Sequence, residues 1–191
     1  MDFLELIKKR RSIRKFKQTP VNRESLLTLI ETACFAHTLC NRQRLRYWIV
    51  LEPQKVDFIF QHSSLGWVTD GEEGLTTEKF APPAYIAITT DGASCNADFA
   101  DAGSAFQNMA IMSMELQLGL FWIHAFSGEI IKNFLQVPEE QTIMALIAVG
   151  HPAETPVAIN IDPSEAEQYF NKKDKAQKVP KLKTKYMVSW R

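Results

Sequence analysis

Several features that would identify a function directly are absent from this 191-residue chain. It has only three cysteines, Cys34, Cys40 and Cys95, an odd number without C-x-x-C spacing. This pattern argues against a disulfide framework and a zinc site, and it favours a reducing cytoplasm. The four histidines are also too far apart in the sequence to form a local metal motif. We therefore expect a cytoplasmic protein without a metal ion.

Long apolar runs and a nucleotide-binding glycine motif are absent as well. No apolar run reaches the roughly 18–20 residues needed to span a bilayer, and acids interrupt the apolar N-terminus, unlike in a signal peptide. No G-x-G-x-x-G occurs, so the sequence shows no Rossmann site for a nicotinamide cofactor. We expect one domain over residues 1–191 that does not contact a membrane.

The charge balances over the whole chain but is unevenly placed. Residues 1–25 carry eight Lys or Arg and three acids, and residues 171–191 carry eight and one. The residues between them carry six basic residues and eighteen acids. The two basic ends could converge on one anionic ligand or could be solvated tails. A nucleic-acid partner is disfavoured, because the middle is acidic and no recognition motif appears.

The most informative segment is Arg10-Arg11-Ser12-Ile13-Arg14-Lys15-Phe16. It places three guanidinium groups and one hydroxyl within five residues. The planar donor fork of Arg matches phosphate oxygens, and a Ser hydroxyl can add a further donor. The segment therefore predicts a phosphate site that needs no Gly-rich loop. A solvated basic segment, or a patch facing lipid or nucleic acid, is the alternative interpretation.

Periodicity predicts a mixed order of helices and strands. Helices are expected at 3–9, from an Asn22 N-cap through 26–37, at 54–61, at 98–118, and from a Ser127 N-cap to residue 135. Strands are expected at 45–51, 84–89 and 143–149, with a loop through Gly66, Gly71 and Gly74. After Pro156 the chain is expected to be polar and irregular until the apolar end at 186–190.

The helix predicted at 98–118 is apolar nearly all round, with Phe99 and Phe106 on one face and Ile111 and Met114 on the other. A chain this small can hardly bury about 30 Å of such a helix by itself. The apolar C-terminus beyond a polar extension also implies docking. We therefore expect a homodimer, with residues 160–191 as a C-terminal extension that docks on the dimer.

Further motifs follow the arginine segment in a fixed order. They are Asn41-x-Gln43 before the 45–51 strand, Asp101-Ala102-Gly103-Ser104-Ala105-Phe106-Gln107-Asn108, Leu146-Ile147-Ala148-Val149-Gly150-His151-Pro152-Ala153-Glu154, and Val188-Ser189-Trp190. In this order and spacing the chain resembles the FMN-dependent nitroreductase family, over nearly its whole length except 55–80. The resemblance implies an α+β fold, with a mostly antiparallel central sheet flanked by helices in an intertwined homodimer. It also implies FMN at the dimer interface and NAD(P)H as a transient electron donor.

The resemblance implies a set of site residues. Arg10, Ser12 and Arg14, with Arg11, would bind the flavin phosphate and ribityl chain, and Lys181, or Lys183 as the near alternative, would complete the phosphate site. Asn41 and Gln43 match positions that contact the flavin from the partner side. The 122–126 segment, including His124 and Ala125, matches a loop whose backbone N–H groups approach flavin N5 and O4. Gly150 matches a glycine where the backbone passes close to the isoalloxazine.

The chain departs from the family pattern at three places. Arg44-Leu45 replaces the usual Pro-Trp, Phe121 replaces the Gly before Trp122, and His124 replaces the Gly after Ile123. His124 could donate to flavin or protonate a substrate, or it could be packed or solvated. Arg44 and Arg46 could steer an anionic substrate or nicotinamide phosphates, although Arg46 is better explained as structural.

Two groups of residues have simpler interpretations. Phe60, His62 and Trp67 fall in the variable region that covers the flavin in this family, where they could shape the pocket or lie at the surface. Cys34 and Cys40 are expected to be small core residues.

We therefore expect a homodimeric flavoenzyme that oxidises NAD(P)H and reduces a nitroaromatic, quinone or related electrophilic acceptor by ping-pong kinetics. The flavin would carry the redox chemistry, so no protein nucleophile is required. The alternative is an FMN-binding protein with little turnover, which serves as a flavin carrier or regulatory partner.

Overall fold

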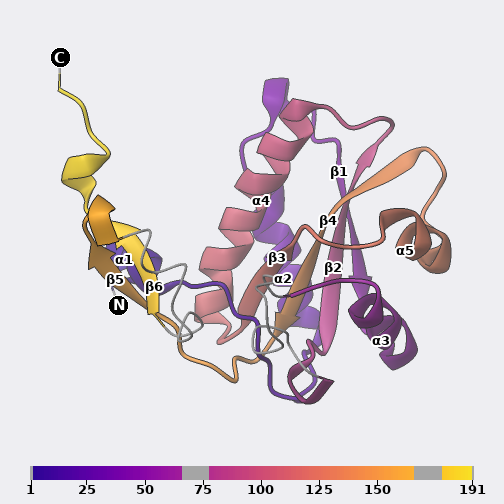
Figure 1. Cartoon of the computed structure of the whole chain (residues 1–191). Helices are drawn as coiled ribbons and strands as arrows, with labels where there is room; N and C mark the ends of the chain where they lie inside the picture. The colour runs from indigo at the N-terminus through magenta and orange to yellow at the C-terminus, as the bar shows by residue number, and fades with distance from the viewer. Residues whose placement is uncertain (1, 66–77, 166–177, 191) are drawn as a thin grey trace.

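A four-stranded antiparallel sheet lies at the centre of the computed structural model, which describes residues 2–65, 78–165 and 178–190 (Figure 1). Its strands follow the order β1 (Leu45–Val50), β2 (Ala84–Asp91), β4 (Gln141–Gly150) and β3 (Gly119–Ile123). The predicted α+β class with an antiparallel central sheet is confirmed. Strands β1, β2 and β4 were predicted from their apolar runs, whereas β3 was not predicted. The predicted loop through Gly66, Gly71 and Gly74 lies outside the described residues, as does Trp67.

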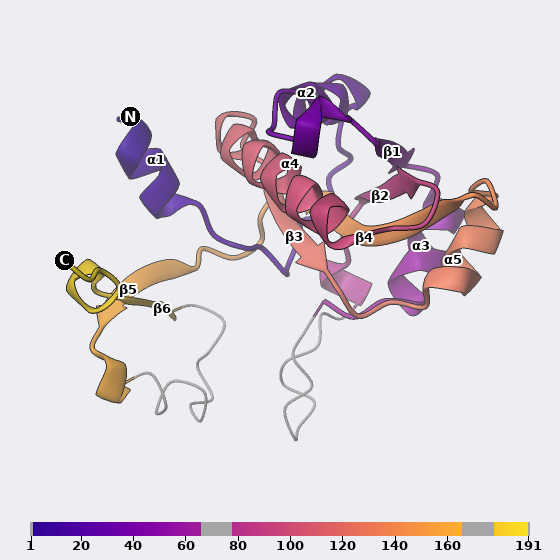
Figure 2. The same ribbon diagram turned by 90° about the horizontal axis from the view of Figure 1, so that it is seen from above.

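Helices cover both faces of this sheet (Figure 2). One core cluster joins the sheet to α2 (Arg23–Cys34) and α4 (Asn96–Glu115), and a second joins it to α3 (Pro53–Gln61) and α5 (Gly128–Leu135). In β2, Ala84, Ile86 and Ile88 belong to the first cluster, and Tyr85 and Ala87 belong to the second. Successive side chains of a strand point to opposite faces. A strand covered on both faces is therefore apolar throughout, which explains the continuous apolar runs.

The helix ends differ in part from the predicted ones. Asn22 caps α2 as predicted, since its side chain accepts a 2.7 Å hydrogen bond from the Ser25 backbone N–H. The prediction that this helix reaches His37 was wrong, because the chain leaves the helix after Cys34. Ser127 precedes α5 as predicted, but its side chain makes no capping hydrogen bond.

Helix α4 ends at Glu115, short of the predicted residue 118. Gln117 adopts a left-handed backbone with φ of 55°, and the Leu118 N–H donates to the Ser113 carbonyl at 2.8 Å. These two features close the helix and release the chain into β3 directly afterwards.

Beyond the sheet, the two ends of the chain lie together. Strands β5 (Val157–Ile161) and β6 (Lys178–Leu182) form a two-stranded parallel sheet beside α1 (Phe3–Lys9), away from the central sheet (Figures 1 and 2). The short 3-10 turn η4 (Thr184–Tyr186) follows, and we call α1, β5, β6, η4 and the residues 187–190 after it the terminal arm. The prediction of irregular structure after Pro156 was wrong for β5 and β6. The arm exposes large apolar side chains, among them Phe3, Met187 and Trp190 at 64%, 72% and 92%.

The segment that joins α1 to the body is fixed along the ends of β3 and β4. The Ile13 N–H donates to the Leu120 carbonyl at 3.0 Å, and the Lys17 N–H donates to the His151 carbonyl at 2.8 Å. Two glycines pair at this end, Gly119 of β3 with Gly150 of β4. A Cβ on Gly119 would lie 2.5 Å from the Ile13 side chain, so this close approach requires a glycine.

The three cysteines, Cys34, Cys40 and Cys95, are all exposed. The expectation that Cys34 and Cys40 are core residues was therefore wrong. Within the described residues, no helix combines the length and apolar character needed to cross a membrane.

Gly150→Ala tests the close packing at this end of the sheet. A Cβ there would lie 2.6 Å from Pro83 and 2.8 Å from the buried ring of Phe16. Overpacking of this kind costs about 1–3 kcal/mol, so the melting temperature should fall. Gly128→Ala is the control, since its Cβ would make an ordinary 3.5 Å contact with Phe126. Equal melting temperatures for the two variants would contradict this account.

Candidate functional site

Three basic residues gather where β6 meets the C-terminal end of α1. Arg10 caps the C-terminal end of α1, Arg11 follows it, and Lys181 lies in β6. We call these three residues the cation cluster. In the described part of the chain, no ion pair joins any of the three to an acid.

The three cations are close enough to affect one another. Burial, and then the charges of Arg11 and Arg10, lower the pKa of Lys181. Burial, and then the charge of Arg11, lower the pKa of Arg10, and burial lowers that of Arg11. The Nε atoms of Arg10 and Arg11 are buried and have no hydrogen-bond partner among the described residues. Such a cluster is suited to an anion with several acceptor oxygens.

Lys183, two residues after Lys181, has different surroundings. Its ammonium lies 2.9 Å from the Asp162 carboxylate, and this hydrogen bond raises the pKa of Lys183. The structure thus brings Lys181 to the arginines and pairs Lys183 with an acid.

Ser12 and Arg14 extend the cluster toward the sheet. Ser12 bridges to Leu120 of β3, and the Arg14 guanidinium lies 4.5 Å from the centre of the Phe121 ring. The Glu154 carboxylate accepts the backbone N–H groups of Arg14 and Lys15, the second at 3.1 Å. Glu154 therefore fixes the direction of this segment through its backbone.

Asn41 and Gln43 belong to a tight exposed turn before β1. The Gln43 side-chain amide donates to the Asn41 side-chain oxygen at 3.0 Å. Cys40, Asn41 and Gln43 all have left-handed backbones, with φ of 52°, 54° and 49°. The turn includes the 3-10 helix η1 (Leu39–Asn41).

Within one chain this turn cannot reach the arginine segment. Strands β1 and β3 are the two edges of the sheet, three strand spacings or about 14 Å apart. The turn and the arginine segment also lie at opposite ends of the sheet. Leu45, just after the turn, pairs with Thr90 at the end of β2. Leu120, which bridges to Ser12, is in register with Ala84 at the start of β2. Figure 1 shows the segment after α1 at the lower edge of the sheet and the start of β1 at the upper edge.

His124 follows β3 and is exposed. The Trp122 indole N–H donates to His124 Nδ1 at 3.1 Å, and the Trp122 ring packs edge-on against Phe106 of α4 at 5.2 Å. Because an indole N–H can only donate, Nδ1 must be unprotonated. The neutral ring then carries its proton on Nε2, which makes His124 a potential hydrogen-bond donor.

The remaining residues considered from sequence have structural partners. Arg44 is 2.9 Å from Asp98, and Arg46 is 2.6 Å from Asp91, so both arginines are paired with acids of the chain. His62 stacks on Phe58 at 4.2 Å, and Phe60 packs against the second core cluster. Ala125 accepts a 2.9 Å hydrogen bond from the Ser64 N–H through its carbonyl. Gly150 is accounted for by its packing against Pro83 and Phe16.

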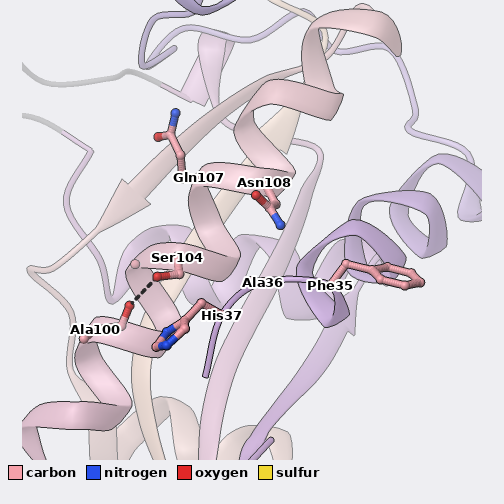
Figure 3. Close-up of a pocket in the computed structure, with 8 residues that line it drawn as sticks. Phe35, Ala36, His37, Ala100, Ser104, Gln107 and Asn108 are labelled. Carbon is pink, nitrogen blue, oxygen red and sulfur yellow. Dashed lines mark hydrogen bonds between the residues drawn. The ribbon is translucent and has the colours of Figure 1, made fainter. Parts of the chain in front are cut away.

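An open hollow of about 580 Å³ lies between the end of α2 and α4 (Figure 3). Ala100 and Ser104 of α4 lie beside His37, while the Phe35 ring points away from α4, and Gly103 also lines the hollow. None of the three residues of the cation cluster lines this hollow. Among the described residues, no group of three or more His, Cys, Asp or Glu could hold a metal ion.

Sequence reasoning missed two features that shape these sites. The Arg44–Asp98 pair joins residues 54 positions apart, and no spacing rule predicts it. Glu154 stands in a motif that was recognised, but its role depends on the strap of residues 12–17, whose position only the fold reveals.

Comparison with known proteins finds relatives in sequence and in structure that are all named as nitroreductases. A Bacillus subtilis (strain 168) protein, YfhC, assigned by name to the NAD(P)H nitroreductases, is 27% identical over 171 residues, which cover 80% of this chain and 85% of that protein. The fold is similar to a nitroreductase family protein of Clostridium difficile 630, with a TM-score of 0.69 at 20% identity, covering 100% of this chain and 98% of that one. It is also similar to an FMN-dependent nitroreductase of Clostridium difficile R20291, with a TM-score of 0.67 at 24% identity, covering 85% and 93%.

The family model of the Nitroreductase family matches residues 7–151. This match spans the strap of residues 12–17, the exposed turn before β1, α4 and all four strands of the central sheet. The chain therefore belongs to the Nitroreductase family.

Proposed function

We propose that this protein is an FMN-dependent oxidoreductase that takes electrons from NAD(P)H and passes them to a nitroaromatic, quinone or related electrophilic acceptor. The observation that carries the proposal is the cation cluster. Three mutually repelling cations without an acidic partner among the described residues, two with buried and unsatisfied Nε atoms, suit a phosphate dianion. Family membership and the names of the relatives support a flavin phosphate as that dianion.

The residues present fit FMN. Arg10, Arg11 and Lys181 would hold the phosphate, and Ser12 and Arg14, which lie along β3, would follow the ribityl chain. The backbone N–H groups of His124 and Ala125, just beyond β3, would stabilise negative charge on the ring. Bound FMN supplies the electron-carrying chemistry, and the protein positions it and tunes its potential.

His124 is the candidate for a role toward the acceptor. Because His124 Nδ1 accepts the Trp122 indole N–H, the Nε2–H of His124 is available to donate to an oxygen of the electron acceptor. Phe121 lies under Arg14, so this departure from the family pattern contributes a ring that positions a basic side chain. Neither departure removes the backbone donors of the 123–126 loop.

We further propose that the functional unit is a homodimer, in which Asn41 and Gln43 complete the flavin site of the partner. Their turn lies at the opposite edge and the opposite end of the sheet from the strap of residues 12–17. The turn and the strap of one chain therefore cannot contact the same flavin. Residues 160–191 would dock on the partner through the exposed apolar side chains of the terminal arm. Three exposed, unbridged cysteines favour a cytoplasmic location.

The first test is spectroscopic. The purified protein should be yellow, should release FMN on denaturation, and should lose its flavin absorbance when NADH or NADPH is added without oxygen. NAD(P)H and the electron acceptor would bind the same site one after the other. Double-reciprocal plots at several acceptor concentrations should therefore be parallel. Intersecting lines would contradict the ping-pong scheme. Bound FMN that NAD(P)H does not bleach would favour the alternative of a flavin-binding protein with little turnover.

Lys181→Gln and Lys183→Gln form a matched pair that tests the phosphate site. Lys181→Gln should weaken FMN binding roughly ten- to a hundredfold, as expected when a charge-assisted hydrogen bond of about 1.5–3 kcal/mol is lost. Riboflavin, which has no phosphate, should lose little affinity, and Lys183→Gln should leave both nearly unchanged. In the ligand-free protein Lys181→Gln should not lower the melting temperature, because it relieves repulsion with Arg10 and Arg11. Equal losses of affinity for FMN and riboflavin would mean that Lys181 supports the fold and does not bind the phosphate.

Sedimentation velocity at micromolar concentration should show a dimer. Truncation after Gln177 removes β6 and the exposed side chains of Met187 and Trp190, so it should weaken both the dimer and FMN retention. Lys181→Gln is the control, since it should weaken FMN binding and leave the dimer intact. A stable folded monomer of the full chain would overturn the shared flavin site.

A further inference from the structure

The turn that carries Asn41 and Gln43 is unusually constrained for an exposed loop. Three of its four residues from Cys40 to Gln43 have left-handed backbones. Asn tolerates this conformation, but Cys and Gln do so only at a steric cost. All side chains from Leu39 to Gln43 are exposed, so packing within the chain does not compensate for this cost.

Both ends of the turn are tied to buried carboxylates of one helix. Asp98 and Asp101 of α4 are only 2% and 5% exposed, and they lie one turn apart. The Asp101 carboxylate accepts the Leu39 N–H at 3.0 Å and 3.2 Å. One guanidinium nitrogen of Arg44, Nη1, donates to both oxygens of the Asp98 carboxylate, at 2.9 Å and 3.1 Å, and the same carboxylate accepts the Cys95 N–H at 2.8 Å.

Arg44 extends the same anchor to the end of β2. Its second nitrogen donates to the Asp91 carbonyl and to the Ala93 carbonyl, the latter at 3.2 Å. Arg46 adds a hydrogen bond to the Gln43 carbonyl at 3.0 Å. The planar guanidinium suits this arrangement, because it reaches a carboxylate and two carbonyls at fixed angles.

We infer that Arg44, Asp98 and Asp101 are positioning residues that hold the 40–43 turn in the conformation in which Asn41 and Gln43 bind flavin. Strained backbone persists where the surroundings over-determine it, and it concentrates at functional sites. Here two buried carboxylates and one guanidinium supply that constraint, and the strained tip points away from its own core. The inference rests on the proposed function, since the flavin is the ligand that the tip would meet.

A double-mutant cycle tests whether Arg44 acts through the tip. Apoprotein is titrated with FMN by flavin fluorescence for the wild type, Arg44→Met, Asn41→Ala/Gln43→Ala, and the combined variant. Arg44→Met should weaken FMN about five- to tenfold, the loss expected for one ordinary hydrogen bond. The same substitution should have no further effect once Asn41 and Gln43 are alanine, whereas its effect on melting temperature should be equal in both backgrounds.

A second readout needs no flavin. In the ligand-free protein, Arg44→Met should speed hydrogen exchange of the 39–44 amides, because it releases one of the two anchors of the turn. Lys55→Met is the control, because it removes a 2.8 Å surface ion pair between Lys55 of α3 and its N-cap residue Glu52, at the other end of β1 from the turn. It should change neither the exchange of 39–44 nor FMN affinity.

The outcomes separate the inference from the proposed function. A wild-type protein that binds no FMN overturns both. FMN binding in the wild type, with equal losses from Arg44→Met in both backgrounds or no loss in either, overturns the inference alone. If Arg44→Met does not fold, Arg44→Lys, which keeps the charge without the fork, and Asp98→Asn, which keeps an acceptor for the Cys95 N–H, take its place in the cycle.

Discussion

The order of the central sheet is the constraint on which the rest of this structure depends. β2 and β4 are buried on both faces and occupy its middle, which leaves β1 and β3 as edges. The turn before β1 and the strap along β3 are therefore fixed at opposite edges and opposite ends. Within a single chain these two segments cannot meet. If both bind one flavin, as proposed above, the second segment must come from a partner copy, and the exposed apolar side chains of the terminal arm offer a surface for that association.

The prediction of the fold from sequence succeeded where burial is local and periodic. The continuous apolar runs of β2 and β4 and the Asn22 cap were recognisable because each depends on neighbouring residues alone. Strand β3 was missed, since Leu116 and Leu118 continue the helical pattern of α4, and only the left-handed Gln117 and the contact of Gly119 with Ile13 end it. Strands β5 and β6 were missed because they are short and pair across a long intervening segment.

The candidate site was predictable to the extent that residue chemistry sets it. Three arginines and a serine within five residues indicate phosphate without any structure, and Lys181 followed from the family motif. The choice between Lys181 and Lys183 did not follow from local chemistry, because it depends on Asp162, which lies across the β5–β6 pair. The Arg44–Asp98 anchor was equally hidden. In sequence Arg44 is one more cation beside a predicted flavin contact, and only burial of Asp98 shows what it holds.

The basic residues considered above fall into two groups, according to whether an acid of the chain pairs with them. Arg44, Arg46 and Lys183 each lie within 2.9 Å of a carboxylate, so their charge is neutralised within the chain. The cation cluster has no such partner among the described residues, although the middle of the chain carries a large excess of acids. Acids were thus available in composition, yet within residues 2–65, 78–165 and 178–190 no ion pair joins an acid to Arg10, Arg11 or Lys181. Repulsion within the cluster opposes folding, and a dianion bound there would remove this cost. Ligand binding and stability should therefore be coupled where β6 meets the end of α1.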